Sequence, residues 1–218
     1  MSRHFLRELE HLKRDVLLMG GMVETAVRRA LDAFLDVDSP KAESVIEGDK
    51  EVDSLELRIE EECLKLLALY GPTARDLRFV VGVNKITNDL ERVGDQAKNI
   101  AERSRMREKG EQVPGMEELS EMAQRVLEML DRSLDAFVGE DANAAREVHR
   151  MDDRVDQLLR MLYDKEEGAV RDDPTRFRAA LRILSTAKYL ERIADHATNV
   201  AEDVVYMVEG SVLKHHHH

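Results

Sequence analysis

Apolar residues recur every three or four positions along most of the chain, the spacing of amphipathic helices. The pattern is plainest in the run Val83, Ile86, Leu90, Val93, Ala97 and Ile100. Its alternating steps of three and four match the heptad of helices packed side by side. Six segments carry this periodicity, at residues 3–37, 41–69, 73–109, 116–138, 142–170 and 175–208. No stretch of useful length alternates as a strand would, so the sequence predicts an all-α protein.

Capping residues, proline and glycine punctuate these segments. Ser39 is the expected N-cap of the second helix, with Pro40 at its first helical position. Asp141 is the expected cap of the fifth helix, and Asp173 with the proline after it repeats the device before the sixth. The pair Gly20–Gly21 interrupts the first helix, and we interpret it as a kink or a point of close packing.

The chain contains an internal duplication. The segment Leu90–Glu102 returns as Leu190–Glu202, an offset of 100 residues, with eight of its residues unchanged. Leu31–Phe34 returns as Leu134–Phe137 at an offset of 103. A period this long indicates a duplicated domain and not a solenoid of short repeats.

The duplication divides the chain near its middle. The glycine- and proline-containing stretch 110–115 is the most linker-like part of the sequence. We therefore expect two tandem three-helix bundles, at residues 1–110 and 111–210. The remaining tail, 211–218, ends in four histidines and is interpreted as carrying a purification tag.

Composition and charge exclude several classes of function. The formal charge of −12 over 218 residues, with no long basic run, disfavours a nucleic-acid partner and direct adsorption to anionic lipid. No hydrophobic run approaches the ~20 residues of a membrane span, and Met1–Arg14 is too charged for a signal peptide. Cys63 is the only cysteine, so a disulfide framework is excluded and a cytoplasmic location is expected. We interpret Cys63 as a core residue.

Pairs of carboxylates one helical turn apart are the candidate chemistry. Each half has one pair on its second helix and one on its third: Asp49/Asp53 with Glu91/Asp95, and Asp152/Asp156 with Glu191/Asp195. On a helical wheel the third-helix acids and Asn99 lie within about 80° of one another, away from the apolar seam. They should face outward or into a groove.

Two interpretations of these acids remain open. Acidic residues normally line a solvated face, and a single such pair would be interpreted that way. However, like charges four residues apart destabilise a helix, and both copies keep the arrangement. Two adjacent pairs would supply four oxygens to a hard cation such as Mg, Ca or Mn, or to a multinuclear iron cluster, with zinc less favoured. His196 is not expected to be a shared ligand, because its counterpart is Gln96.

A di-iron oxidase is the natural rival, since such bundles bury two Glu-x-x-His motifs. Only Glu8-x-x-His11 matches, once, and away from the apolar seam of its helix. The sequence also lacks a phosphate-binding glycine loop, a nucleophile signature and a cysteine cluster. These observations argue against an enzyme.

The repeated phrase Leu-Glu-Arg-(Val/Ile)-(Gly/Ala)-Asp-x-Ala-x-Asn-(Ile/Val)-Ala-Glu, twice in six helices, resembles the PhoU family. The resemblance covers essentially the whole chain and includes Gly71–Arg78, similar to that family's Pro-x-Ala-x-Asp-Leu-Arg segment. It implies two tandem three-helix bundles in a cytoplasmic, often dimeric protein. It also implies a negative regulator of phosphate uptake, linking the ATPase subunit of a phosphate ABC transporter to a sensor histidine kinase.

The same resemblance implies metal clusters on the four carboxylate pairs. Two departures concern the second copy, which has Ala194 in place of Gly94 and Arg176–Arg178 in place of the Asp-Leu-Arg segment. The resemblance therefore favours the first site. We expect a regulatory adaptor without catalytic activity, with a metal-dependent enzyme and a purely structural scaffold as the alternatives.

Overall fold

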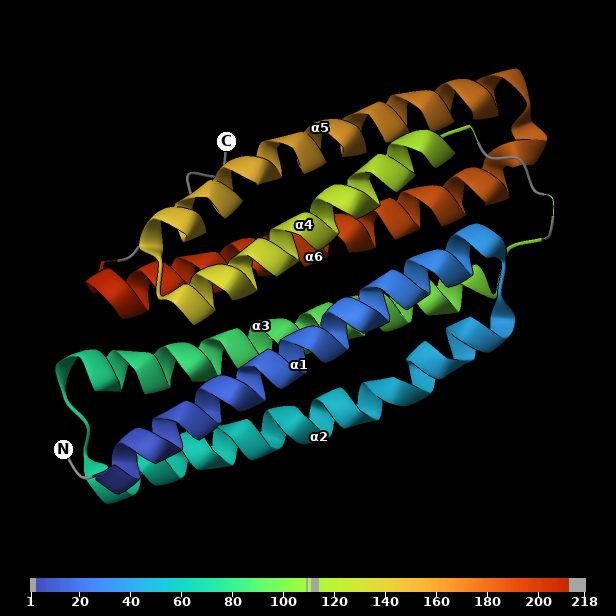
Figure 1. The fold of residues 1–218 in the computed structure, drawn as a ribbon. Coiled ribbons are helices and arrows are strands. Elements are labelled where there is room, and N and C mark those ends of the chain that lie inside the picture. Colours follow the sequence, from blue (N-terminus) through green and yellow to red (C-terminus); the bar gives the residue numbers. More distant parts are fainter. Residues whose placement is uncertain (1–2, 109, 111–113, 212–218) are drawn as a thin grey trace.

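The computed structural model describes residues 3–108, 110 and 114–211 (Figure 1). The first half contains α1 (Arg3–Asp36), α2 (Ser39–Tyr70) and α3 (Ala74–Ser104), and the second contains α4 (Met116–Gly139), α5 (Ala142–Asp172) and α6 (Phe177–Glu209). A single 3-10 turn, η1 (Pro174–Arg176), precedes α6. No strand occurs among these described residues, and the prediction of an all-α fold with six long helices is confirmed.

The two halves form three-helix bundles that lie side by side (Figure 1). They meet where α3 packs against α6 and α1 against α4. Gly20 explains the second contact, because a Cβ atom built there would lie 2.7 Å from Cδ1 of Leu134. Of the two interpretations of Gly20–Gly21, close packing is confirmed for Gly20, while α1 continues through the pair without interruption.

Two predicted helix ends differ from the structure. Asp38, and not Ser39, is the N-cap of α2, and its Oδ1 accepts a hydrogen bond from the backbone N–H of Lys41 at 3.0 Å. A carboxylate accepts more strongly than a hydroxyl and also benefits from the helix dipole, which explains the choice. The Asp141 cap of α5 is confirmed by hydrogen bonds from the N–H groups of Asn143 and Ala144.

The helix α3 ends at Ser104 and not near residue 109 as predicted. The chain turns there because Arg107 reaches back to α1, where its guanidinium donates to the carbonyl of Phe34 and lies 4.9 Å from the ring centroid. The last turn of α1 has no basic residue of its own. Arg107 therefore satisfies the free carbonyls at the end of α1 from another part of the chain.

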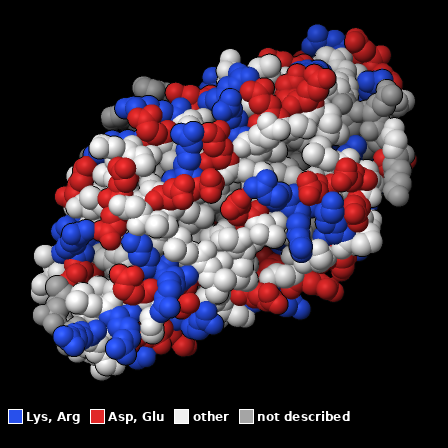
Figure 2. Space-filling model, in the orientation of Figure 1, with Lys and Arg blue, Asp and Glu red and all other residues white. Residues whose placement is uncertain are grey.

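Several sequence-based predictions concern the interior and the surface. Cys63 is buried, and burial raises the pKa of its thiol to about 12, which confirms its interpretation as a core residue. None of the described helices is both long and apolar enough to cross a bilayer. Figure 2 shows acidic and basic side chains interspersed over one face of the molecule. The predicted boundary at 110/111 and the tail from residue 212 involve positions outside the described residues.

Candidate metal centres

The second half brings its four predicted carboxylates together between α5 and α6. Burial, and after it the negative charges of Asp195, Asp156 and Glu191 in that order, raise the pKa of Asp152 to about 7. The pKa of Asp195 is also raised, first by burial and then by Glu191, while Lys188 opposes the shift. The other acids of the predicted set are therefore close enough to Asp152 and Asp195 to disfavour the ionisation of these two.

This second cluster leaves carboxylate oxygens without hydrogen-bond partners. Oδ1 of Asp152 and Oε2 of Glu191 are buried, and neither has a partner in the structure. Cations reach two of the other oxygens: Lys188 Nζ donates to Oε1 of Glu191 at 2.6 Å, and the guanidinium of Arg160 lies 3.8 Å from Oδ2 of Asp156. A buried oxygen that carries negative charge and lacks a donor destabilises the fold, and Asp152 in particular has no cation partner among the described residues.

The first half arranges the equivalent acids differently. Asp49, with a side chain only 5% exposed, accepts a hydrogen bond from Nζ of Lys98 at 2.6 Å. This hydrogen bond is the largest cause of a raised pKa at Lys98, and the charges of Asp95 and Asp53 contribute in the same direction. A lysine of the protein thus already supplies positive charge to the first cluster. Its counterpart in the second half is Thr198.

Glu56 belongs to the first cluster and was missed by the sequence analysis. Burial raises the pKa of Glu56, followed by the charges of Glu60 and Asp53. The pKa of Glu91 is raised by burial, then by Asp95, then by Glu56. The signal was available, because Glu56 lies three residues after Asp53 and so shares its face of α2. The equivalent position in α5 is Leu159.

The remaining polar residues of the repeated phrase serve other contacts. His196 and Asn199 both turn to the first bundle, where His196 Nδ1 lies 2.8 Å and Asn199 Nδ2 3.1 Å from Oδ1 of Asp89. The counterpart Gln96 is buried, and its Oε1 has no hydrogen-bond partner. Glu8 and His11 form a surface pair 3.9 Å apart on α1. That His196 is not a ligand shared by both copies stays a prediction.

Both clusters consist of carboxylate oxygens that could act as metal ligands, and their acids outnumber the cations that pair with them. The second cluster also has buried oxygens without hydrogen-bond partners. This chemistry fits a hard cation. As they lie in this structure, no three His, Cys, Asp or Glu side chains among the described residues are grouped closely enough to hold a metal ion. Binding would therefore require the carboxylates to change rotamer. Asp195, which is exposed, and Asp156, which is half-buried, have room to do so.

Comparison with known proteins identifies the fold and the repeat. A family model described as the PhoU domain matches residues 16–104 and again residues 119–204. The chain belongs to the PhoU family. Each match contains one complete carboxylate cluster, so the duplicated motif and the duplicated domain coincide.

Relatives of this PhoU-family chain match over nearly their whole length. The phosphate-specific transport system accessory protein PhoU homolog of Pseudomonas aeruginosa is 37% identical over 216 residues, covering 99% of this chain and 89% of the relative. The homolog of Aquifex aeolicus is 39% identical, covering 97% of this chain and 96% of the relative. The crystal structure of PhoU from Pseudomonas aeruginosa superposes with a TM-score of 0.91 at 38% identity, covering 95% of this chain and all of that one.

Proposed function

We propose that this chain is a non-catalytic regulator of phosphate transport, and that it acts as an adaptor controlled by metal bound at its carboxylate clusters. The observation that carries the proposal is the presence of one carboxylate cluster in each of the two PhoU-domain matches. The proposal is supported by the relatives, which are named as phosphate-specific transport system accessory proteins. The near-complete coverage on both sides supports transfer of that role to the whole chain.

The residues proposed to hold metal are the eight predicted ones: Asp49, Asp53, Glu91 and Asp95 in the first cluster, and Asp152, Asp156, Glu191 and Asp195 in the second. A bound divalent or trivalent cation such as Mg, Mn, Ca or iron would supply positive charge that relieves the repulsion among these carboxylates. The second cluster has the greater need, because Lys98 pairs with the buried Asp49 of the first, whereas the equivalent Asp152 has a buried oxygen without a partner. This reverses the order that the family resemblance favoured.

The partners follow the family resemblance. We propose that the chain docks on the ATPase subunit of a phosphate ABC transporter and on a sensor histidine kinase, and represses the starvation response while phosphate is plentiful. We further propose that it does so as a cytoplasmic homodimer. The absence of a spanning helix among the described residues supports docking on the membrane proteins from one side.

A genetic experiment tests the regulatory role. Deletion of the gene is expected to release a phosphate-starvation reporter at high phosphate, and the wild-type gene is expected to restore repression. Continued repression in the deletion strain would refute the adaptor. Complementation with a variant that carries both Asp152→Asn and Asp156→Asn tests the role of metal. We expect this variant to be present in the cell but unable to repress the reporter.

Two measurements separate the alternatives. Elemental analysis of untagged, natively purified protein is expected to find stoichiometric metal, with less in Asp195→Ala; a protein without metal would support a structural scaffold. Metal-loaded protein is expected to show no turnover on phosphoesters, polyphosphate or peroxide. Turnover that disappears with Asp152→Asn would establish the metal-dependent enzyme instead.

A further inference from the structure

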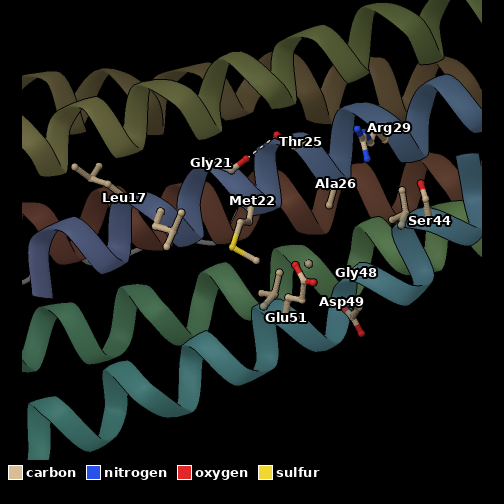
Figure 3. Close-up of a pocket in the computed structure, with 14 residues that line it drawn as sticks. Leu17, Gly21, Met22, Thr25, Ala26, Arg29, Ser44, Gly48, Asp49 and Glu51 are labelled. Carbon is tan, nitrogen blue, oxygen red and sulfur yellow. Dashed lines mark hydrogen bonds between the residues drawn. The ribbon is translucent and has the colours of Figure 1, made fainter.

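An apolar trough runs between α1 and α2 in the first bundle (Figure 3). Its volume is about 410 Å³, within the range of small-molecule sites. Leu17, Leu18, Met22 and Ala26 of α1 face Val45 and Val52 of α2 across it. Leu18 is 54% exposed, so the trough is open to solvent along part of its length.

Three glycines create this space. Gly21 and Gly48 line the trough, and a Cβ atom built on either would contact nothing within 4 Å. Gly94 of α3 lies beneath them, where an added Cβ would be 3.4 Å from Cγ1 of Val52. Glycine in a helix interior destabilises it by roughly 0.5–1 kcal/mol relative to alanine, so three around one space require a reason beyond helix stability.

The second bundle provides an internal comparison, because the duplication gives each trough residue a counterpart. The three glycines correspond to Gln124, Met151 and Ala194. Met151 packs against the core. Where the trough has Leu18 and Glu51, the second bundle has Glu121 and Arg154, joined by an ion pair of 2.6 Å between α4 and α5. The second bundle is therefore filled and closed where the first is open.

One end of the trough is positively charged. Arg29 lies there with Ser44, four residues beyond Thr25 (Figure 3). Arg29 is exposed and makes no hydrogen bond or ion pair with any described residue, whereas its neighbour Arg28 pairs with Glu24 at 2.8 Å. An apolar channel that ends at an unpaired guanidinium is complementary to an apolar chain with an anionic head.

The dimensions of the trough indicate which kind of ligand fits it. Leu17 and Arg29 are twelve residues apart on α1, which places them about 18 Å apart along the helix. A twelve-carbon acyl chain is about 15 Å long when extended, from C–C bonds of about 1.5 Å. A partner helix of that length and about 10 Å diameter would occupy more than ~1,000 Å³, well above the 410 Å³ available. The trough therefore fits one extended alkyl chain and not a partner helix.

We propose that this trough binds a free medium- to long-chain fatty acid, with its alkyl chain between α1 and α2 and its carboxylate on Arg29. The net charge of −12 disfavours approach to an anionic bilayer, so the ligand is a monomer taken from solution and not a lipid still in the membrane. This proposal does not depend on the proposed regulatory function. Asp49 lines both the trough and the first carboxylate cluster, so variants at Asp49 are left out of the test.

Calorimetric titration of the untagged full chain with sodium dodecanoate, below the concentration at which it forms micelles, tests the proposal. A chelator is present so that the carboxylate cannot ligate a metal. One dodecanoate is expected to bind per chain with a submillimolar dissociation constant. Decanoate should bind roughly tenfold more weakly, because two methylenes fewer are buried.

Gly48→Met introduces into the trough the residue found at the equivalent position of the second bundle, and it should weaken dodecanoate binding at least tenfold. The fold should accept this side chain, because the space around Gly48 is open. Gly21→Gln is the second variant with the same expectation. Gly168→Met is the matched control, since Gly168 of α5 also has open space and lies outside the trough. Its binding should equal that of the wild type.

The head-group contact has its own pair of variants. Arg29→Gln should weaken dodecanoate binding by about fivefold and leave dodecanol binding unchanged, and Arg28→Gln should affect neither. The proposal is refuted by absence of dodecanoate binding up to millimolar concentration, by undiminished binding in both trough variants, or by an equal loss in Gly168→Met. Association with phosphatidylglycerol vesicles without binding of free dodecanoate would also overturn it, in favour of a membrane-lipid site.

Discussion

Neutralising Asp152 should stabilise the metal-free protein. Burial and four neighbouring carboxylates raise the pKa of Asp152 from 3.8 to about 7. A shift of about three units corresponds to roughly 4 kcal/mol of free energy that ionised Asp152 removes from the folded state. Asparagine keeps the shape of the side chain and removes the charge, so Asp152→Asn should recover about 2–4 kcal/mol at pH 8.

The raised pKa of Asp152 determines how its contribution to folding stability changes with pH. Because the pKa is higher in the folded state, the folded chain retains a proton that the unfolded chain has lost between about pH 4 and pH 7. The stability contributed by this group therefore falls as pH rises through that window and is constant above it. The difference between Asp152→Asn and wild type should be near zero at pH 4 and reach its plateau above pH 7.

Urea denaturation in the presence of a chelator, at several pH values from 4 to 8, measures this difference. Asp49→Asn is the matched control at the equivalent position of the first half. It should destabilise the protein by about 1–3 kcal/mol at pH 7, because Lys98 loses its carboxylate partner. Loss of stability in Asp152→Asn at pH 8, or equal effects of the two variants, would refute the argument that the charge of Asp152 is not balanced by a cation of the protein.

Three further predictions concern the packing and the helix ends, each measured by urea denaturation. Arg107→Ala should destabilise the protein by about 2 kcal/mol, because the carbonyls at the end of α1 lose their donor; an unchanged midpoint would contradict this role. Gly20→Leu should lower stability by about 1–3 kcal/mol through collision with α4, whereas Gly21→Leu should be neutral or gain about 0.5–1 kcal/mol. Asp38→Ala should cost about 1 kcal/mol and Ser39→Ala much less, and the reverse order would restore Ser39 as the cap.

The fold could be predicted from the sequence because its determinants are local. Heptad spacing, proline and glycine at helix ends and an offset of about 100 residues are all visible without knowledge of contacts in space. The errors occurred where a residue distant in the sequence decides the local structure. The helix α3 ends early because Arg107 contacts the carbonyl of Phe34, and no pattern within residues 73–109 shows that contact.

The sequence shows which of the predicted acids lie near one another, but it does not show the electrostatics of the clusters. Spacing along one helix shows that Glu91 and Asp95 share a face, and the duplication identifies their partners on the preceding helix. It does not show whether a cation from the protein reaches the cluster. Lys98 lies within the repeated phrase, yet only the structure shows that its ammonium binds Asp49 across the helix pair.

The two copies therefore keep the same acids but differ in what balances them, and this difference bears on the proposed regulation. The first cluster has Lys98, whereas the second has buried oxygens without partners and a carboxylate that ionises only near neutral pH. A cation entering the second cluster would act on α6 at Asp195, and the adjacent His196 contacts Asp89 of the first bundle. Because one turn of α6 faces both the cluster and the neighbouring bundle, a change in metal occupancy would act directly on the surface where the two halves meet.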